Sequence, residues 1–354
     1  MFVPLILATL VAADAKADFT HVPDDAVVVA RLEAAELYRS PAVDLVRLLI
    51  DKAGTSARKA FDRRFVPAPS SVQRVWLVAR RPVNPSDGES VFLVQTDTAF
   101  DAKAALTNLM PQGVRRKIGD RVYVVQPGRF ALSILDETTF VVGPEALVAS
   151  YLGAPRTGAS PAVAAWGQTT HAACWIWWNN AVVMKELLRS RGEVPERSKP
   201  FFPVFHAKSG VVTLDLSRNL NDATFEMRLL YADEAEAEVA EEAAKKGLVL
   251  AREHLREMIA KLEKETLAAP AAEENSIRPL KLFVGAYSTG TLRGYDKLLA
   301  TMPLHRDGAS LATSGSMTHL YSLMAHLAVL GQQAGPVRST TTNVIEPRPA
   351  PKPE

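Results

Sequence analysis

The stretch 171–180, HAACWIWWNN, holds Trp175, Trp177 and Trp178 together with the only cysteine of the chain. In a β-strand, alternate side chains face opposite sides of the sheet. Trp175 and Trp177 would therefore lie on one face, and Cys174, Ile176 and Trp178 on the other. Both sets are apolar, which is typical of a strand that is covered on both sides. This segment is therefore expected to be covered on both faces of the sheet.

The following sequence predicts a hairpin from 210–217 (GVVTLDLS) and 221–230 (NDATFEMRLL), with one apolar face and one polar face. If 172–178 joins that sheet, Trp175 and Trp177 come out on its less covered face. We expect the other of the two related units described below to bury them, because leaving a tryptophan of about 250 Å² exposed forgoes several kcal/mol at about 25 cal/mol per Å². The alternative is that Trp175 and Trp177 form an exposed aromatic platform that binds a sugar ring or a partner.

A similar order of elements occurs twice along the chain. Residues 24–53 and 172–191 each predict a strand followed by a helix, and 72–96 and 210–230 each predict a hairpin. Helices are then expected at 98–110 and 233–267, and further hairpins at 114–126 and 304–316. This order predicts an α+β fold of two related units, each a mainly antiparallel sheet with helices mostly on one face. We assign the units to 18–153 and 172–331, joined by a linker at 154–171.

The helix expected at 233–267 is long for such a unit. An α-helix of that length reaches about 50 Å, which is more than a small sheet can cover. Either Gly247 breaks the helix, or its free part packs on another helix.

The N-terminal residues point to export. Residues 2–13 form an apolar run too short to span a bilayer, and the small residues that follow it suit a signal peptidase. We therefore expect 1–17 to be a signal peptide and the protein to be periplasmic or extracellular. The proline-rich segment 332–354 is expected to be a disordered tail. No other stretch is predicted to cross a membrane, and a lone Cys174 permits no intramolecular disulfide.

No catalytic, cofactor or metal motif stands out. The net charge of +2 gives no reason to expect a nucleic-acid partner. The glycines of 285–294 (GAYSTGTLRG) have the spacing of a phosphate-binding loop but lack its Lys-Ser/Thr pair, which favours a bend or a loose helix. His319 and His326 lie about 10 Å apart on one helix face, too far to share a zinc ion without other ligands. We assign no catalytic residue, no metal ligand and no cofactor.

Four segments, 19–44 (FTHVPDDAVVVARLEAAELYRSPAVD), 65–78 (FVPAPSSVQRVWLV), 138–152 (TTFVVGPEALVASYL) and 247–255 (GLVLAREHL), resemble exported, duplicated α+β proteins of planctomycete-type bacteria. This resemblance implies export and duplication, and it carries no functional residue across. With the absence of enzymatic motifs, it favours a non-enzymatic binding or scaffolding protein of the cell envelope, whose partner is an unidentified protein or small ligand. The alternative is a hydrolase whose site is assembled from scattered residues. The oligomeric state stays open.

Overall fold

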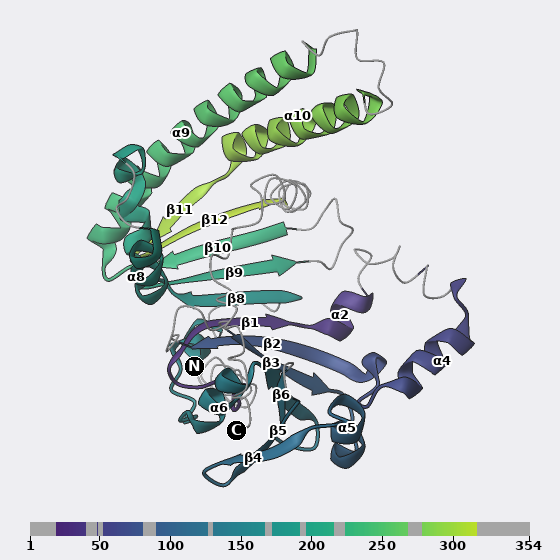
Figure 1. Cartoon of the computed structure of the whole chain (residues 1–354). Helices are drawn as coiled ribbons and strands as arrows, with labels where there is room; N and C mark the ends of the chain where they lie inside the picture. The colour runs from purple at the N-terminus through teal and green to yellow at the C-terminus, as the bar shows by residue number, and fades with distance from the viewer. Residues whose placement is uncertain are drawn as a thin grey trace, which may run out of the picture.

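The computed structural model of the chain describes residues 19–39, 48, 52–80, 90–126, 130–166, 172–191, 196–215, 224–267 and 278–316. The expected signal peptide and proline-rich tail lie outside these residues, as do His319 and His326. The described part is an α+β structure built on one antiparallel sheet of twelve strands, in the order β11-β12-β10-β9-β8-β1-β2-β3-β7-β6-β5-β4 (Figure 1). The predicted α+β class and antiparallel pairing are thus confirmed.

The first half of the chain supplies one side of the sheet. Its strands are β1 (Ala26–Leu32), β2 (Val72–Arg80), β3 (Ser90–Thr96), β4 (Val114–Ile118), β5 (Arg121–Val125), β6 (Ala131–Ile134) and β7 (Thr139–Gly143). Its helices are α2 (Ala34–Arg39), α4 (Thr55–Arg64), α5 (Ala102–Leu109), α6 (Glu145–Gly153) and α7 (Pro161–Trp166), with a 3₁₀ turn at Pro69–Ser71. The helix α7 lies within the segment expected as a linker.

The second half supplies the other side. Its strands are β8 (Cys174–Asn179), β9 (Ser209–Asp215), β10 (Thr224–Leu230), β11 (Leu304–Asp307) and β12 (Ser310–Ser316). Its helices are α8 (Asn180–Arg191), α9 (Glu234–Leu267) and α10 (Arg278–Thr301), with a 3₁₀ segment, η3, at Glu196–His206. The predicted hairpin of 210–217 and 221–230 is confirmed as the β9–β10 pair.

The sheet differs from the expectation in two ways. Strands of the two halves were expected to form separate sheets, but β1 pairs with β8 and makes the sheet continuous. The hairpins 114–126 and 304–316 were expected to correspond, but β12 lies beside β10 whereas β7, not β5, lies beside β3. By position, β11–β12 therefore matches β6–β7, and β4–β5 is an addition at the edge. Hydrophobic alternation identifies strands but not the partner of each strand, which explains both differences.

Helices cover both faces of the sheet rather than mostly one. On one face, α6 and α7 pack with residues 19–22 over the strands at the centre of the sheet. On the opposite face, α5 covers β5–β7 and α9 covers β10 and β12. Alternate residues of each strand point to opposite faces of the sheet. In β5, Val124 packs in the cluster beneath α5, and Val125 packs in the cluster beneath α6 and α7.

The long helix 233–267 is confirmed as the 34-residue α9, and Gly247 does not break it. Its part beyond the sheet packs against α10, so that the two helices extend past the strands as a pair (Figure 1). The glycine-rich run 285–294, expected as a bend or loose helix, lies inside the regular helix α10. Among the described residues, no helix is both long and apolar enough to span a bilayer.

Candidate functional site

Trp175 and Trp177 are buried, with 0% and 1% of their surfaces exposed. Trp175 packs edge-on against Trp166 of α7, with ring centroids 5.4 Å apart, and against Phe19 at 5.8 Å. The cover thus comes in part from Phe19 of the first unit, as expected, and in part from Trp166, which lies in the segment expected as a linker. Neither ring is exposed, so the two tryptophans do not present an aromatic platform in this structure.

Trp178 faces the opposite side, as predicted, and packs with the cluster beneath α9. It lies directly across from Gly210 on β9. A Cβ atom at Gly210 would lie 2.0 Å from the Trp178 ring, so only glycine leaves room for this indole. The indole nitrogen donates to Asn180 Oδ1 at 3.1 Å. All three tryptophans of β8 are therefore accounted for by packing.

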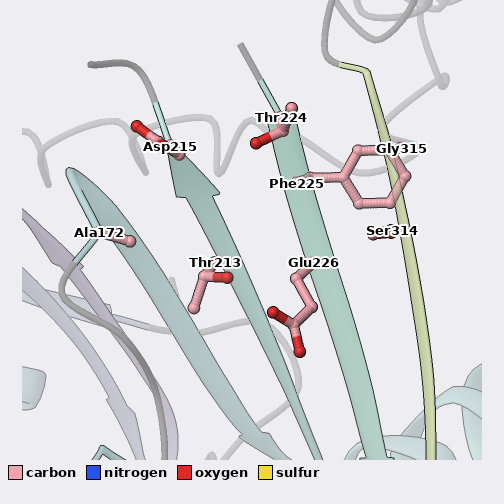
Figure 2. A pocket seen from close by; sticks show the side chains of 8 residues that line it. All are labelled: Ala172, Thr213, Asp215, Thr224, Phe225, Glu226, Ser314 and Gly315. Carbon is pink, nitrogen blue, oxygen red and sulfur yellow. The ribbon is translucent and has the colours of Figure 1, made fainter. Parts of the chain in front are cut away.

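A first hollow of about 380 Å³ lies at the ends of β9, β10 and β12 (Figure 2). Its polar side chains include Thr213, Asp215, Glu226 and Ser314. Since Asp215 pairs with Thr224, the two carboxylates are diagonal neighbours, about 7–8 Å apart at their Cα atoms. Figure 2 shows their side chains pointing in different directions. The Glu226 carboxylate accepts a hydrogen bond from Arg228 at 3.1 Å.

A larger cavity, of about 730 Å³, opens where β5 and β6 diverge. These strands pair only through Val124–Leu132 and Val125–Ala131. Beyond that point Ser133 Oγ bridges the gap by donating to the Val122 carbonyl at 2.7 Å. We call the space between α5, the diverging strands and the end of α6 the crevice. Its volume falls within the range of small-molecule pockets, about 300–1,000 Å³.

The two ends of the crevice differ in chemistry. On the α5 side the lining is aliphatic, with Leu106, Val124, Leu132 and Ile134. On the α6 side it carries the guanidinium groups of Arg121 and Arg156. Arg121 Nη1 donates to the Leu152 carbonyl at 2.8 Å, and Arg156 Nη2 donates to the Tyr151 carbonyl at 2.5 Å. Because both acceptors lie in the last turn of α6, these bonds also cap the helix.

The remaining charges near the crevice are partly compensated. Burial lowers the pKa of His21, against the opposing effect of Asp136, whose Oδ2 lies 2.8 Å from His21 Nε2. His21 is therefore mainly neutral at pH 7. Arg115 and Asp120, also in the lining, are exposed and opposite in charge. The net positive charge of the crevice thus comes from Arg121 and Arg156.

Sequence reasoning did not find the crevice. It exists because two neighbouring strands separate after two residue pairs, and this depends on pairing that the sequence pattern does not reveal. The available signal was the shortness of Ala131–Ile134. Within the described ranges, no group of three or more His, Cys, Asp or Glu side chains is placed to hold a metal ion.

Comparison with known proteins adds only a loose likeness in fold. No protein-family model and no curated protein matches the sequence. Crystal forms I and IV of TP0453 align with 87% of this chain and 96% of that one, at 12% and 10% identity and TM-scores of 0.38 and 0.40. Crystal form III aligns similarly, at 12% identity and a TM-score of 0.39. No residue role or function follows from so weak a similarity.

Proposed function

We propose that this chain is a non-enzymatic binding protein of the cell envelope, and that its ligand occupies the crevice between β5 and β6. The observation that carries this proposal is a cavity of about 730 Å³ with an aliphatic wall and two guanidinium groups. Pockets of this size, mostly apolar with a few placed polar groups, are typical of ligand sites.

Export and duplication are part of the same proposal. Export rests on residues 1–17, and mass spectrometry of protein from the native host should find a new N-terminus near Lys16 or Asp18. Intact Met1 on cytoplasmic protein would contradict export.

Duplication of one α+β unit is supported by matching strand orders, β1-β2-β3-β7-β6 and β8-β9-β10-β12-β11.

A hydrolase is the alternative, and the hollow in Figure 2 is its best location because it contains two carboxylates, those of Asp215 and Glu226. General acid–base chemistry needs carboxylates that converge on one substrate atom. The divergent directions of these two groups, and the engagement of Glu226 by Arg228, favour binding over hydrolysis.

The crevice can be tested by blocking its mouth. Ala102 lines the crevice at the start of α5 and is exposed, so Ala102→Trp adds a large side chain there without disturbing the core. Protein purified from its host under mild conditions should release a small molecule on denaturation, detectable by mass spectrometry. We expect Ala102→Trp to lose it and Ala260→Trp, on the exposed surface of α9, to retain it. Equal retention by both variants would contradict the assignment of the crevice as the ligand site.

A further inference from the structure

We propose that the crevice binds an anionic amphiphile: an aliphatic chain ending in a carboxylate or phosphate group. The head group would lie between Arg121 and Arg156, and the chain would lie against Leu106 and Ile134. This inference rests on the proposed function and specifies its ligand.

The two arginines have no acidic partner. Among the described residues, no carboxylate forms an ion pair with the exposed Arg121 or the partly buried Arg156. Most other partly buried arginines of these residues are paired, as Arg80 is with Asp25. Burial lowers the pKa of Arg156, and the positive charges of Arg121 and Arg80 lower it further, against an opposing effect of Tyr151. Arg156 is therefore partly desolvated and is repelled by the positive charge of Arg121, and an anion between the two guanidinium groups would relieve that cost.

The capping of α6 leaves most hydrogen-bond donors of Arg121 and Arg156 unused. A guanidinium carries five N–H donors, and each of the two spends one on a carbonyl of α6. The Nε of Arg156 is buried and has no hydrogen-bond partner, which is costly for a donor on a charged group. The Tyr151 ring covers one face of the Arg156 guanidinium, whose Cζ lies 4.1 Å from the centre of the ring. The donors left for an anion of planar or tetrahedral geometry are thus the unused Nη–H groups, because the Nε is enclosed.

The opposite wall explains why the ligand needs an aliphatic part. Leu106 and Ile134 are only partly buried, with the fully buried Leu132 between them and no charged neighbour in the lining on that side. The cavity, of about 730 Å³, is also far larger than an inorganic anion needs. For comparison, a water molecule occupies only about 30 Å³ in the liquid. Filling the aliphatic end with a hydrocarbon chain removes its apolar surface from water, at about 25 cal/mol per Å².

The test is calorimetric titration of the full chain with four probes: dodecanoate, dodecyl phosphate, dodecanol and inorganic phosphate. We expect both anionic amphiphiles to bind about tenfold or more tightly than dodecanol, since charged hydrogen bonds contribute at least that much. The tighter of the two anionic probes distinguishes a fatty acid from a phospholipid-type ligand. Inorganic phosphate should bind weakly, because it leaves the aliphatic wall empty.

Variants locate the head group. Arg121→Gln and Arg156→Gln should each weaken dodecanoate binding about tenfold and leave dodecanol binding unchanged. Arg116→Gln is the matched control, because Arg116 pairs with Glu145 and does not line the crevice. Should either variant unfold through loss of the α6 cap, the salt dependence of the unmodified protein still tests for a cationic head-group site: added salt should weaken dodecanoate binding and spare dodecanol.

Equal affinity for dodecanoate and dodecanol would overturn this inference but would not contradict the proposed binding function. Equal affinity for phosphate and dodecyl phosphate would overturn the aliphatic half of it. Failure of every probe, combined with retention of a native ligand by Ala102→Trp, would overturn both the inference and the proposed site.

Discussion

At the scale of single residues, the tryptophans of β8 connect the two halves of the protein. Trp177 pairs with Val29 of β1 on one side and Val211 of β9 on the other. Trp175 pairs with Arg31, whose guanidinium lies 4.2 Å from the centre of the Trp166 ring. The aromatic residues that look most like a ligand platform in the sequence are therefore the centre of the core.

Trp177→Ala should lower the free energy of unfolding by about 3–5 kcal/mol, because it removes a fully buried ring and leaves a cavity. Urea denaturation followed by circular dichroism measures the change. The control is Phe92→Ala, on the same sheet but 45% exposed, which should cost about 1 kcal/mol or less. Similar costs for the two variants would contradict the burial of Trp177.

At the scale of elements, sequence patterns predicted the type and limits of each helix or strand better than they predicted its neighbours. The limits of α9 and the β9–β10 hairpin followed from periodicity and turn residues, which are local properties. The pairing of β1 with β8, and of β7 rather than β5 with β3, depends on distant contacts and was not predicted. The crevice was missed for the same reason.

The α9–α10 pair depends on ionic contacts that can be titrated. Asp296 of α10 accepts hydrogen bonds from Arg252 Nε at 2.9 Å and Arg256 Nε at 3.3 Å. The bond from Arg252 lowers the pKa of Asp296, against an opposing effect of desolvation, and the bond from Arg256 lowers it further. A carboxyl group whose pKa is lower in the folded state stabilises that state above the unfolded pKa of about 3.9. This contribution is lost as the pH falls through the folded pKa.

Asp296→Asn should therefore lower the melting temperature at about pH 6 and lower it less at about pH 3, where protonation of this carboxyl in the unfolded chain already removes part of the contribution. Thermal melts followed by circular dichroism at the two pH values measure the difference. Asp307→Asn, at an exposed position of the edge strand β11, should show no comparable pH-dependent loss. An equal loss for Asp296→Asn at both pH values would show that the ionic contacts do not stabilise the helix pair.

At the scale of the whole molecule, one continuous sheet and a shared core join the two halves. The cluster around Trp175 combines Phe19, Val29 and Trp76 of the first half with Trp177 and Val211 of the second. Separate clusters lie beneath α9 and beneath α5, each confined to one half. Because β1 and β8 exchange backbone hydrogen bonds along their lengths, unfolding either half would expose the shared core.

We therefore expect the protein to unfold in one cooperative transition. Leu311→Ala, in the cluster beneath α9, and Leu132→Ala, in the cluster beneath α5, should each cost about 2–5 kcal/mol, because both leucines are buried. Four of the five tryptophans lie in the shared core, so their fluorescence reports on the centre of the sheet, whereas circular dichroism is dominated by helices such as α9 and α10. In a single transition, each substitution must shift the fluorescence and dichroism midpoints in denaturant by the same amount. If Leu311→Ala moved the dichroism midpoint and left the fluorescence midpoint in place, the halves would be independently stable despite their shared sheet.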